Sequence, residues 1–255
     1  MENNSTNIQN EIIIGRNSIK EALVANRCIN SILIAANVQN ASLKNIVTMA
    51  KERKIPVKKV DSQKLNSLCQ NANHQGIIAM VAAQKYASVD EIFEVALQKN
   101  EQPFIIVADE IADPHNLGAI IRTAECAGAH GIIIPNRRAV GLSFAVSKAA
   151  AGALEHMKVA RVINISTTLD DLKKHGLWIF GADMDGQTYC QTDLTGAIAL
   201  VIGSEGFGLS RLVKEKCDVI LSLPLCGKIN SLNASVAAGI LTYEIARQRL
   251  NLSAK

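Results

Sequence analysis

Three segments of this 255-residue chain place amide, carboxylate, hydroxyl and guanidinium groups near glycine, each after an apolar run that predicts a strand. Such groups can hold a ligand and stabilise charge that develops during a reaction. In an open parallel sheet, the loops that follow the strands share one edge, where ligands bind. We therefore expect one site built from all three segments: residues 113–123 with Asn116 and Arg122, residues 203–210 with Glu205, and residues 227–235 with Ser231 and Asn233.

Each of these polar residues also has an ordinary structural interpretation. Asn116 and Asn233 stand immediately before helical apolar patterns, where an asparagine commonly caps a helix N-terminus. Arg122 lies in an otherwise apolar helix pattern, where it is equally well explained as a solvated arginine on the polar face. The segments are therefore informative mainly in combination.

The glycines of these segments do not match the common phosphate-binding motifs. Residues 203–208 have the spacing G-x-x-G-x-G, whereas the dinucleotide fingerprint is G-x-G-x-x-G. Glu205 inside this cluster would also repel a pyrophosphate. A Walker loop is excluded because Gly227-Lys228 is followed by Ile229 and lacks the preceding glycine. The G-x-S-x-G motif of serine hydrolases is also missing from the sequence.

The first part of the chain alternates strand and helix patterns, which predicts a small α/β domain with a mostly parallel sheet over residues 11–85. Residues 1–10 are polar and are expected to form a disordered tail. The predicted strands are 12–14, 31–36, 56–60 and 76–83, and the predicted helices are 17–25, 41–53 and 61–70, with Asn17 and Asp61 as caps.

The second part of the chain, residues 104–255, predicts a larger domain with a parallel sheet, joined to the first by a polar linker over residues 86–103. Its run at 197–203 is the most hydrophobic and is expected to be a central strand. The other predicted strands are 104–109, 131–135, 157–162, 177–182 and 219–224, and the predicted helices are 117–127, 143–151, 166–175, 209–217 and 234–250.

Composition limits the function classes. No apolar run approaches the roughly 20 residues that cross a bilayer, and the polar N-terminus does not resemble a signal peptide. The net charge of +4 permits a polyanionic partner, while the low aromatic content of 4% argues against base-stacking platforms as the main contact to RNA. The six cysteines include no C-x-x-C pair and no histidine at ligand spacing, which predicts no metal site and reduced thiols in a cytoplasmic protein.

Taken together, the three polar segments closely resemble the motifs of the SpoU (TrmH-type) family of RNA ribose 2′-O-methyltransferases, over roughly residues 104–250. Residues 11–85 are similar to the substrate-binding domain of those members that methylate a guanosine of large-subunit ribosomal RNA. One departure is Lys228-Ile229-Asn230, where many members have smaller residues. The matching motifs are Asn116 to Thr123, Gly203-Ser-Glu-Gly206-x-Gly208, Leu223-Pro224 with Ser231 to Val236, and, in the first domain, Gly15-Arg16 and Asn73 to Gly76.

The resemblance implies a fold, a cofactor and an assembly. The second domain would contain a deep trefoil knot (the SPOUT fold), in which S-adenosylmethionine lies bent against the backbone of Gly203, Leu223 and Leu232. Glycine at positions 203 and 227 would let the cofactor approach closely. Members of the family act as homodimers, and the last helix, with Ile240, Leu241 and Ile245, is the expected dimer face.

The resemblance also implies a reaction, the attack of a ribose 2′-OH on the cofactor methyl group, with Arg122 as the key residue. A guanidinium stays protonated, so we expect Arg122 to hold a phosphate and stabilise the developing alkoxide. Glu205, Asn233, Asn116 and Ser231 would orient this arrangement. RNA phosphates would contact the basic residues Arg16, Lys20, Arg27, Arg137 and Arg138.

Two alternatives to ribosomal RNA methylation stay open from the sequence. One is a ribose methyltransferase of the same superfamily that acts on tRNA. The other is a non-catalytic protein of the same fold that binds RNA or assists ribosome assembly, which the presence of Arg122, Glu205 and Asn233 argues against.

Overall fold

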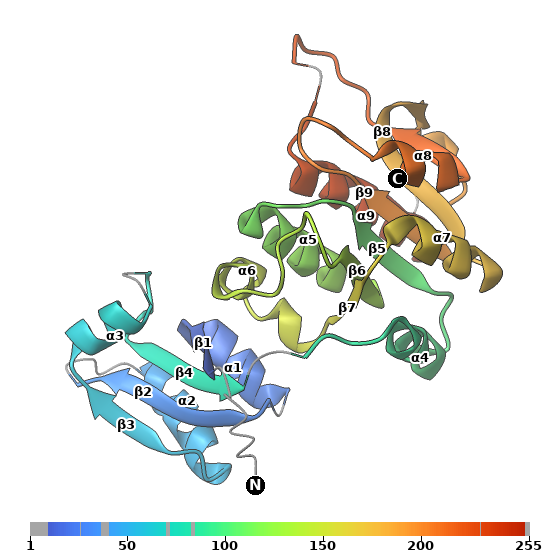
Figure 1. Cartoon of the computed structure of the whole chain (residues 1–255). Helices are drawn as coiled ribbons and strands as arrows, with labels where there is room; N and C mark the ends of the chain where they lie inside the picture. The colour runs from blue at the N-terminus through green and yellow to red at the C-terminus, as the bar shows by residue number, and fades with distance from the viewer. Residues whose placement is uncertain are drawn as a thin grey trace, which may run out of the picture. The chain divides into compact units, whose positions relative to one another are not determined.

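A computed structural model describes residues 10–25, 27–36, 41–69, 72–82, 85–229 and 231–252 of the protein. The chain divides into two compact units, Met1–Lys85 and Tyr86–Lys255 (Figure 1). Of the segment expected to form a tail, residues 1–9 lie outside the described residues, and Asn10 is the first residue of a strand.

Unit 1 is a four-stranded sheet with the order β1-β4-β2-β3. The expectation of a mostly parallel sheet is wrong, because β4 lies between β1 and β2 and runs antiparallel to both, and only β2 and β3 are parallel. The position of β4 depends on long-range pairing, which an apolar run does not reveal. The elements are β1 (Asn10–Ile14), α1 (Arg16–Val24), β2 (Ile29–Ala35), α2 (Ala41–Glu52), β3 (Val57–Val60), α3 (Ser62–Leu68) and β4 (Ile77–Ala82).

The predicted helix caps of unit 1 have different outcomes. Asp61 caps α3 as predicted, since its side chain accepts a hydrogen bond from the Gln63 backbone N–H. Asn17 does not cap α1, because this helix begins one residue earlier and Gly15 occupies the cap position at φ 87°. That backbone conformation suits glycine.

Unit 2 is a six-stranded sheet with the order β10-β8-β9-β5-β6-β7, in which every neighbouring pair of strands is parallel. The most hydrophobic strand, β9, is central, as predicted. The elements are α4 (Val89–Lys99), β5 (Phe104–Ala108), α5 (Pro114–Cys126), β6 (Gly131–Pro135), α6 (Phe144–Ala150), η1 (Ala153–Glu155), β7 (Lys158–Val162), α7 (Ile165–Lys174), β8 (Trp178–Thr188), η2 (Tyr189–Gln191), β9 (Ile198–Ile202), α8 (Arg211–Lys216), β10 (Val219–Ser222) and α9 (Ala234–Arg249).

Helices cover both faces of this sheet, which explains the almost uninterrupted apolar sequence of its central strands. One buried cluster joins alternate strand residues to α5, α6 and α9, and a second joins the intervening residues to α4, α7 and α8 (Figure 1). Strand β10 is at the edge of the sheet and is mostly half-buried. The candidate site therefore forms at an accessible side of the sheet.

The segment 86–103, which was expected to be a linker, belongs to unit 2. Ser88 and Glu91 form a capping box at the start of α4, and Ile92 of this helix is fully buried in the core of unit 2. Ala87 pairs with Ala160 beside β7. The polar residues that suggested a linker lie on the solvent side of α4 and in the short turn that follows it.

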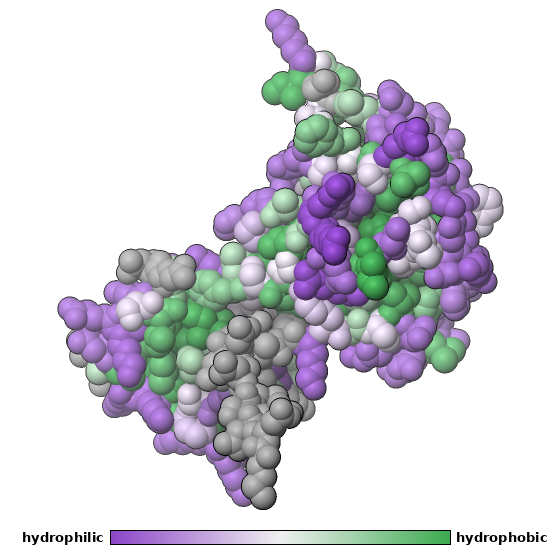
Figure 2. Space-filling view, viewed as in Figure 1, coloured by the Kyte–Doolittle hydropathy of each residue, from purple (hydrophilic) through white to green (hydrophobic). Residues whose placement is uncertain are grey.

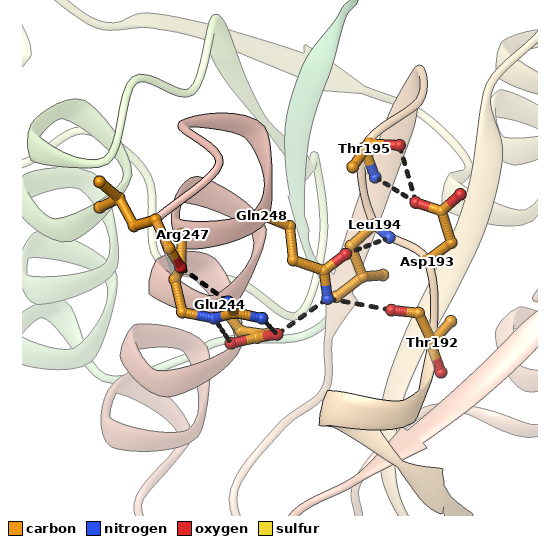
Figure 3. Close-up of polar contacts among 8 residues, drawn as sticks. Thr192, Asp193, Leu194, Thr195, Glu244, Arg247 and Gln248 are labelled. Carbon is orange, nitrogen blue, oxygen red and sulfur yellow. Dashed lines mark hydrogen bonds and ion pairs between the residues drawn. The ribbon is translucent and has the colours of Figure 1, made fainter. Parts of the chain in front are cut away.

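Helix α9 is anchored near its C-terminal end by a network of side chains (Figure 3). Glu244 accepts hydrogen bonds from Arg247 and from the amide of Gln248, each at 2.8 Å. The same amide donates to the Thr192 carbonyl at 3.0 Å, and its oxygen accepts from the Leu194 N–H at 2.8 Å. These contacts hold the C-terminal part of α9 against the loop that leads into β9.

Candidate active site

The side chains of Asn116, Glu205 and Asn233 form a connected polar triad. The amide Nδ2 of Asn116 donates to Glu205 Oε1 at 2.8 Å, and Nδ2 of Asn233 donates to Asn116 Oδ1 at 3.0 Å. Asn233 Nδ2 also donates to Glu205 Oε1. Each predicted loop thus contributes one residue, and two amides point their donors at one carboxylate oxygen.

Asn116 is available for this triad because another residue caps α5. The sequence suggested Asn116 as the cap, but the helix begins at Pro114 and Asp113 occupies the cap position. The Asp113 carboxylate accepts from the backbone N–H groups of His115 and Asn116 at 3.3 and 3.1 Å. Asn116 itself is buried, with 6% of its surface exposed, and an amide at such a position needs partners of its own.

Asn233 has both roles that the sequence suggested. Its Oδ1 accepts from the Ser235 N–H at 2.9 Å and the Val236 N–H at 3.3 Å, which caps α9. Its Nδ2 faces Asn116 and Glu205. The cap therefore fixes the side-chain orientation that the triad requires.

Glu205 lies in a tight glycine turn after β9. Ser204 and Gly208 exchange backbone hydrogen bonds at 3.0 Å across this turn. A Cβ at Gly203 would come within 2.2 Å of the Gly208 carbonyl carbon, so glycine is required here to close the turn itself. The buried carboxylate of Asp109 accepts from the Ser210 N–H at 3.2 Å and ties the end of the turn to the end of β5.

A cavity of about 280 Å³ opens beside the triad. Its lining includes all three residues expected to contact a cofactor, Gly203, Leu223 and Leu232, together with Glu205 and Ser231. Ala237 and Leu241 of α9 also line the cavity. The structure thus brings together most of the site residues that the sequence suggested.

Two glycine arguments from the sequence are modified by the structure. The turn geometry accounts for Gly203 without a ligand, as described above. A Cβ at Gly227 would have no neighbour closer than the Ile229 nitrogen at 4.0 Å, so nothing crowds this position. Residues 224–229 are exposed in the loop that projects from unit 2 (Figure 1), and the surface of this loop mixes apolar and polar side chains (Figure 2).

Sequence reasoning missed one ionisable residue of the cavity, Asp183. This residue follows the run 177–182 that predicted a strand, but β8 continues as far as Thr188. Its carboxylate is bonded to Lys214 at 2.9 Å. The Asp-x-Asp pattern of Asp183 and Asp185 directly after an apolar run was the only signal available.

The comparisons with known proteins agree with this geometry. Residues 103–243 match the model of the SpoU rRNA Methylase family, and residues 12–87 match the model for RNA 2′-O ribose methyltransferase substrate binding. The chain belongs to the SpoU rRNA methylase family. A Bacillus subtilis (strain 168) relative, which bears the name TrmH family tRNA/rRNA methyltransferase YacO, is 46% identical over 242 residues, or 94% of this chain and 97% of that protein.

Two solved structures of SpoU proteins show the same fold. The SpoU methyltransferase AviRb from Streptomyces viridochromogenes, in complex with the cofactor AdoMet, has a TM-score of 0.77 at 23% identity and covers 94% of this chain and 91% of its own. The A. aeolicus TrmH/SpoU tRNA modifying enzyme has a TM-score of 0.53 at 28% identity and covers 59% of this chain and 77% of its own. The trefoil knot implied by membership of the SpoU family stays a prediction.

The residue expected to be central in a SpoU enzyme, Arg122, lies apart from the triad. It is exposed on α5, forms no hydrogen bond or ion pair with a described residue, and is not part of the cavity lining. Asn116 precedes it by six residues on the same helix, which places the two side chains on different sides of α5. The structure therefore shows Arg122 available to a ligand but not connected to Glu205 or Asn233.

The basic residues expected to contact RNA in this SpoU protein differ in their surroundings. Arg16 donates from Nε to the Gln75 carbonyl at 3.2 Å and from its backbone to the Gln75 side chain. Arg138 pairs with Glu110 at 3.2 Å, and Arg137 is exposed. The Arg138 side chain is nevertheless 80% exposed, so Arg137 and Arg138 are both accessible.

The described residues contain neither a metal-ligand cluster nor a helix that could cross a membrane. No group of three or more His, Cys, Asp or Glu side chains among them could hold a metal ion. None of the helices in the described part of the chain is long and apolar enough to cross a membrane.

Proposed function

We propose that this protein transfers a methyl group from S-adenosylmethionine to the ribose 2′-OH of a guanosine in large-subunit ribosomal RNA, as a cytoplasmic homodimer. The observation that carries the proposal is the cavity lined by Glu205, whose carboxylate is held by Asn116 and Asn233 where three strand-to-helix loops meet. Similarity of fold alone would support membership of the SpoU family but not a particular reaction.

The residues of the cavity fit the cofactor. At about 280 Å³, the cavity is close to the lower end of the range of roughly 300–1,000 Å³ typical of small-molecule sites. Its walls are apolar at Leu223, Leu232 and Leu241 and polar at Ser231 and Glu205. Backbone groups of the loops would hold the cofactor, which supplies an electrophilic methyl group when it is bound.

Arg122 stabilises charge in the proposed reaction. A neutral hydroxyl is a poor nucleophile and must lose its proton in or before the transition state. A guanidinium stays protonated and cannot accept that proton, but it can hold the adjacent phosphate with two parallel hydrogen bonds and stabilise the developing alkoxide. The exposure of Arg122 fits contact with a large polyanionic substrate.

The triad positions the ribose in this proposal. Glu205 Oε1 is occupied by the two amides, and Oε2 accepts no hydrogen bond from a described residue. This second oxygen is available to a ribose hydroxyl. Asn116 and Asn233, at the N-termini of two helices, hold the Glu205 carboxylate in place before the substrate binds. Such pre-organised polar groups stabilise the charge of a transition state without having to reorient during the reaction.

The choice of ribosomal RNA rests on unit 1. Residues 12–87 match a substrate-binding domain of RNA 2′-O ribose methyltransferases, and this unit has its own sheet and core. The tRNA-modifying structure from A. aeolicus corresponds to 59% of this chain. A separate unit of this kind fits a large folded RNA better than a small one, and tRNA is the alternative substrate.

The proposed homodimer rests on an exposed apolar stripe of α9. Val236, Ile240 and Tyr243 follow helical spacing and are 49%, 39% and 54% exposed. Of the three residues expected on a dimer face, only Ile240 is exposed, since Leu241 and Ile245 are buried inside unit 2. Sedimentation of wild type and of Ile240→Glu tests the stripe: we expect a dimer that the variant weakens, and a monomeric wild type would contradict it.

Methyl transfer into separate pools of RNA tests the proposed function. Wild-type protein with radiolabelled S-adenosylmethionine is expected to label large-subunit ribosomal RNA, in the naked or partly assembled form, and to leave tRNA unlabelled. Labelling confined to tRNA would favour the alternative substrate. Tight RNA binding with no incorporation into any RNA would favour a non-catalytic assembly protein.

A further inference from the structure

The cavity beside the triad has an acidic lining. Asp183 and Glu205 are the only ionisable side chains among the described residues that line it, and no lysine, arginine or histidine joins them. The rest of the wall is apolar, glycine or serine. A ligand held here therefore experiences the field of two carboxylates with little compensation from the cavity surface itself.

Asp183 is held firmly in this position. Its Oδ1 accepts from the Met184 N–H at 2.7 Å, and its Oδ2 pairs with Lys214 Nζ at 2.9 Å. Only 15% of the side chain is exposed, and a Cβ placed on Gly208 would lie 3.6 Å from Oδ2. The carboxylate thus stands against the glycine turn that carries Glu205.

Asp183 is also charged at neutral pH. Burial raises the pKa of its carboxyl, but hydrogen bonds from Lys214 and from backbone N–H groups lower it more, so the pKa lies below the ordinary value. Lys214 weakens the field of Asp183 but is not part of the cavity lining, so the carboxylate is the charge that faces a ligand in the cavity.

The methyl transfer changes the charge of the ligand in the cavity. The carbon–sulfur bond of S-adenosylmethionine breaks, the methyl group bonds to the ribose oxygen, and the hydroxyl proton leaves to solvent. The sulfonium becomes a neutral thioether, so the net charge of the ligand falls from +1 in the cofactor to 0 in S-adenosylhomocysteine. The two carboxylates of the cavity attract the first ligand more strongly than the second.

We propose that Asp183 is a specificity residue that makes the cavity prefer the cationic cofactor over its neutral product. This inference rests on the proposed function. A carboxylate several ångströms from a cation in a partly solvated cavity is expected to change affinity by roughly 3- to 10-fold. The consequence is easier exchange of product for fresh cofactor after each turnover.

Calorimetric binding of three probes tests the proposal without any RNA. The probes are S-adenosylmethionine, sinefungin, which carries an ammonium in place of the sulfonium, and S-adenosylhomocysteine. In Asp183→Asn we expect binding of the two cationic probes to weaken roughly 3- to 10-fold and binding of the neutral product to change less than about 2-fold. Asp185→Asn is the matched control, because its side chain is 86% exposed and outside the cavity, and it should leave all three affinities nearly unchanged.

A second variant separates charge from damage to the fold. Lys214→Met removes the positive neighbour of Asp183, so the preference for cationic probes should increase, which a loosened structure would not produce. Equal weakening of all three probes in Asp183→Asn, together with an unchanged preference in Lys214→Met, would overturn the inference. If the wild type binds none of the probes, it is the proposed function that fails.

Discussion

Asn233 Nδ2 donates a hydrogen bond to Asn116 Oδ1 at 3.0 Å, although 117 positions of the sequence separate the two residues. This bond joins the N-terminal ends of α5 and α9, and both amides donate to Glu205. The partial positive charges of two helix N-termini favour a carboxylate at this point. The triad therefore links the pre-organisation of the site to the packing of two helices.

Two substitutions at Asn233 separate its cap from its role in the triad. Asn233→Asp keeps an oxygen for the Ser235 and Val236 N–H groups but places a second carboxylate against Glu205. We expect stability near that of wild type and methyl transfer reduced by roughly 100-fold, the scale of a lost positioning contact. Asn233→Ala should in addition lose about 1 kcal/mol of stability, because the cap is removed. Urea unfolding and single-turnover transfer measure the two effects, and full activity in Asn233→Asp would exclude the triad from the reaction.

Arg122→Ala should abolish methyl transfer and leave cofactor affinity within about 3-fold, because Arg122 is outside the cavity lining. Its exposure predicts a stability change within about 0.5 kcal/mol. Arg122→Lys should also lose most activity, since lysine cannot make the bidentate contact to a phosphate. Calorimetry and single-turnover rates check both variants. An Arg122→Lys protein with wild-type rates would show that bidentate phosphate binding is the wrong mechanism.

His130 makes the stability of unit 2 depend on pH. This histidine is buried, with Nδ1 accepting from the Phe104 N–H at 2.9 Å and Nε2 facing Glu101 at 3.0 Å. Burial lowers its pKa from 6.5, although Glu101 acts in the opposite direction. The unfolded chain therefore binds a proton more readily, and the contribution of His130 is present above pH 6.5 and lost as the pH falls below it.

Chemical unfolding between pH 5 and 8 measures this contribution, which for one group is at most about 1.4 kcal/mol per pH unit. His130→Asn keeps an acceptor for the Phe104 N–H. In this variant the free energy of unfolding should depend less on pH below pH 6.5. Replacement of the exposed His115 by glutamine is the control and should leave the profile unchanged. An identical slope in wild type and His130→Asn would contradict the assignment.

Gln248→Ala should destabilise the protein by about 1–3 kcal/mol, because it leaves the Leu194 N–H and the Thr192 carbonyl without their partner (Figure 3). Glu244, which is buried, would also lose one of its donors. Arg211→Gln, at a side chain that is 85% exposed, is the control and should change stability by less than about 0.5 kcal/mol. Thermal unfolding of the two variants makes the comparison. Equal unfolding midpoints would show that the Gln248 hydrogen bonds do not stabilise the packing of α9.

The sequence predicted most strands and helices of unit 2 from residue 104 onward, because the central strands are buried on both faces and form nearly continuous apolar runs. It did not predict that Asp113 caps α5, since Asp113 and Asn116 are both good capping residues and only the structure shows which begins the helix. That choice determines whether Asn116 is free to join the triad. The position of β4 and the membership of residues 86–103 in unit 2 were missed because both depend on long-range packing.

The site itself was predicted in part. Asn116, Glu205 and Asn233 were expected together and are hydrogen-bonded to one another. Arg122 was expected with them but has no contact to the triad, because six residues of helix turn its side chain to another side of α5. Asp183 was missed, since an Asp-x-Asp pattern after an apolar run does not by itself indicate a binding site.

The position of the transferred methyl group tests the account most directly. A 2′-O-methyl group blocks alkaline cleavage of the RNA strand at that nucleotide, because the free 2′-OH is the group that attacks the phosphate. RNA labelled by the wild-type protein should therefore yield an alkali-resistant dinucleotide that contains the label, and Arg122→Ala and Asn233→Asp should yield little or none. A labelled base in an alkali-sensitive nucleotide, or equal labelling by all three proteins, would contradict the assignment of this site to ribose methylation.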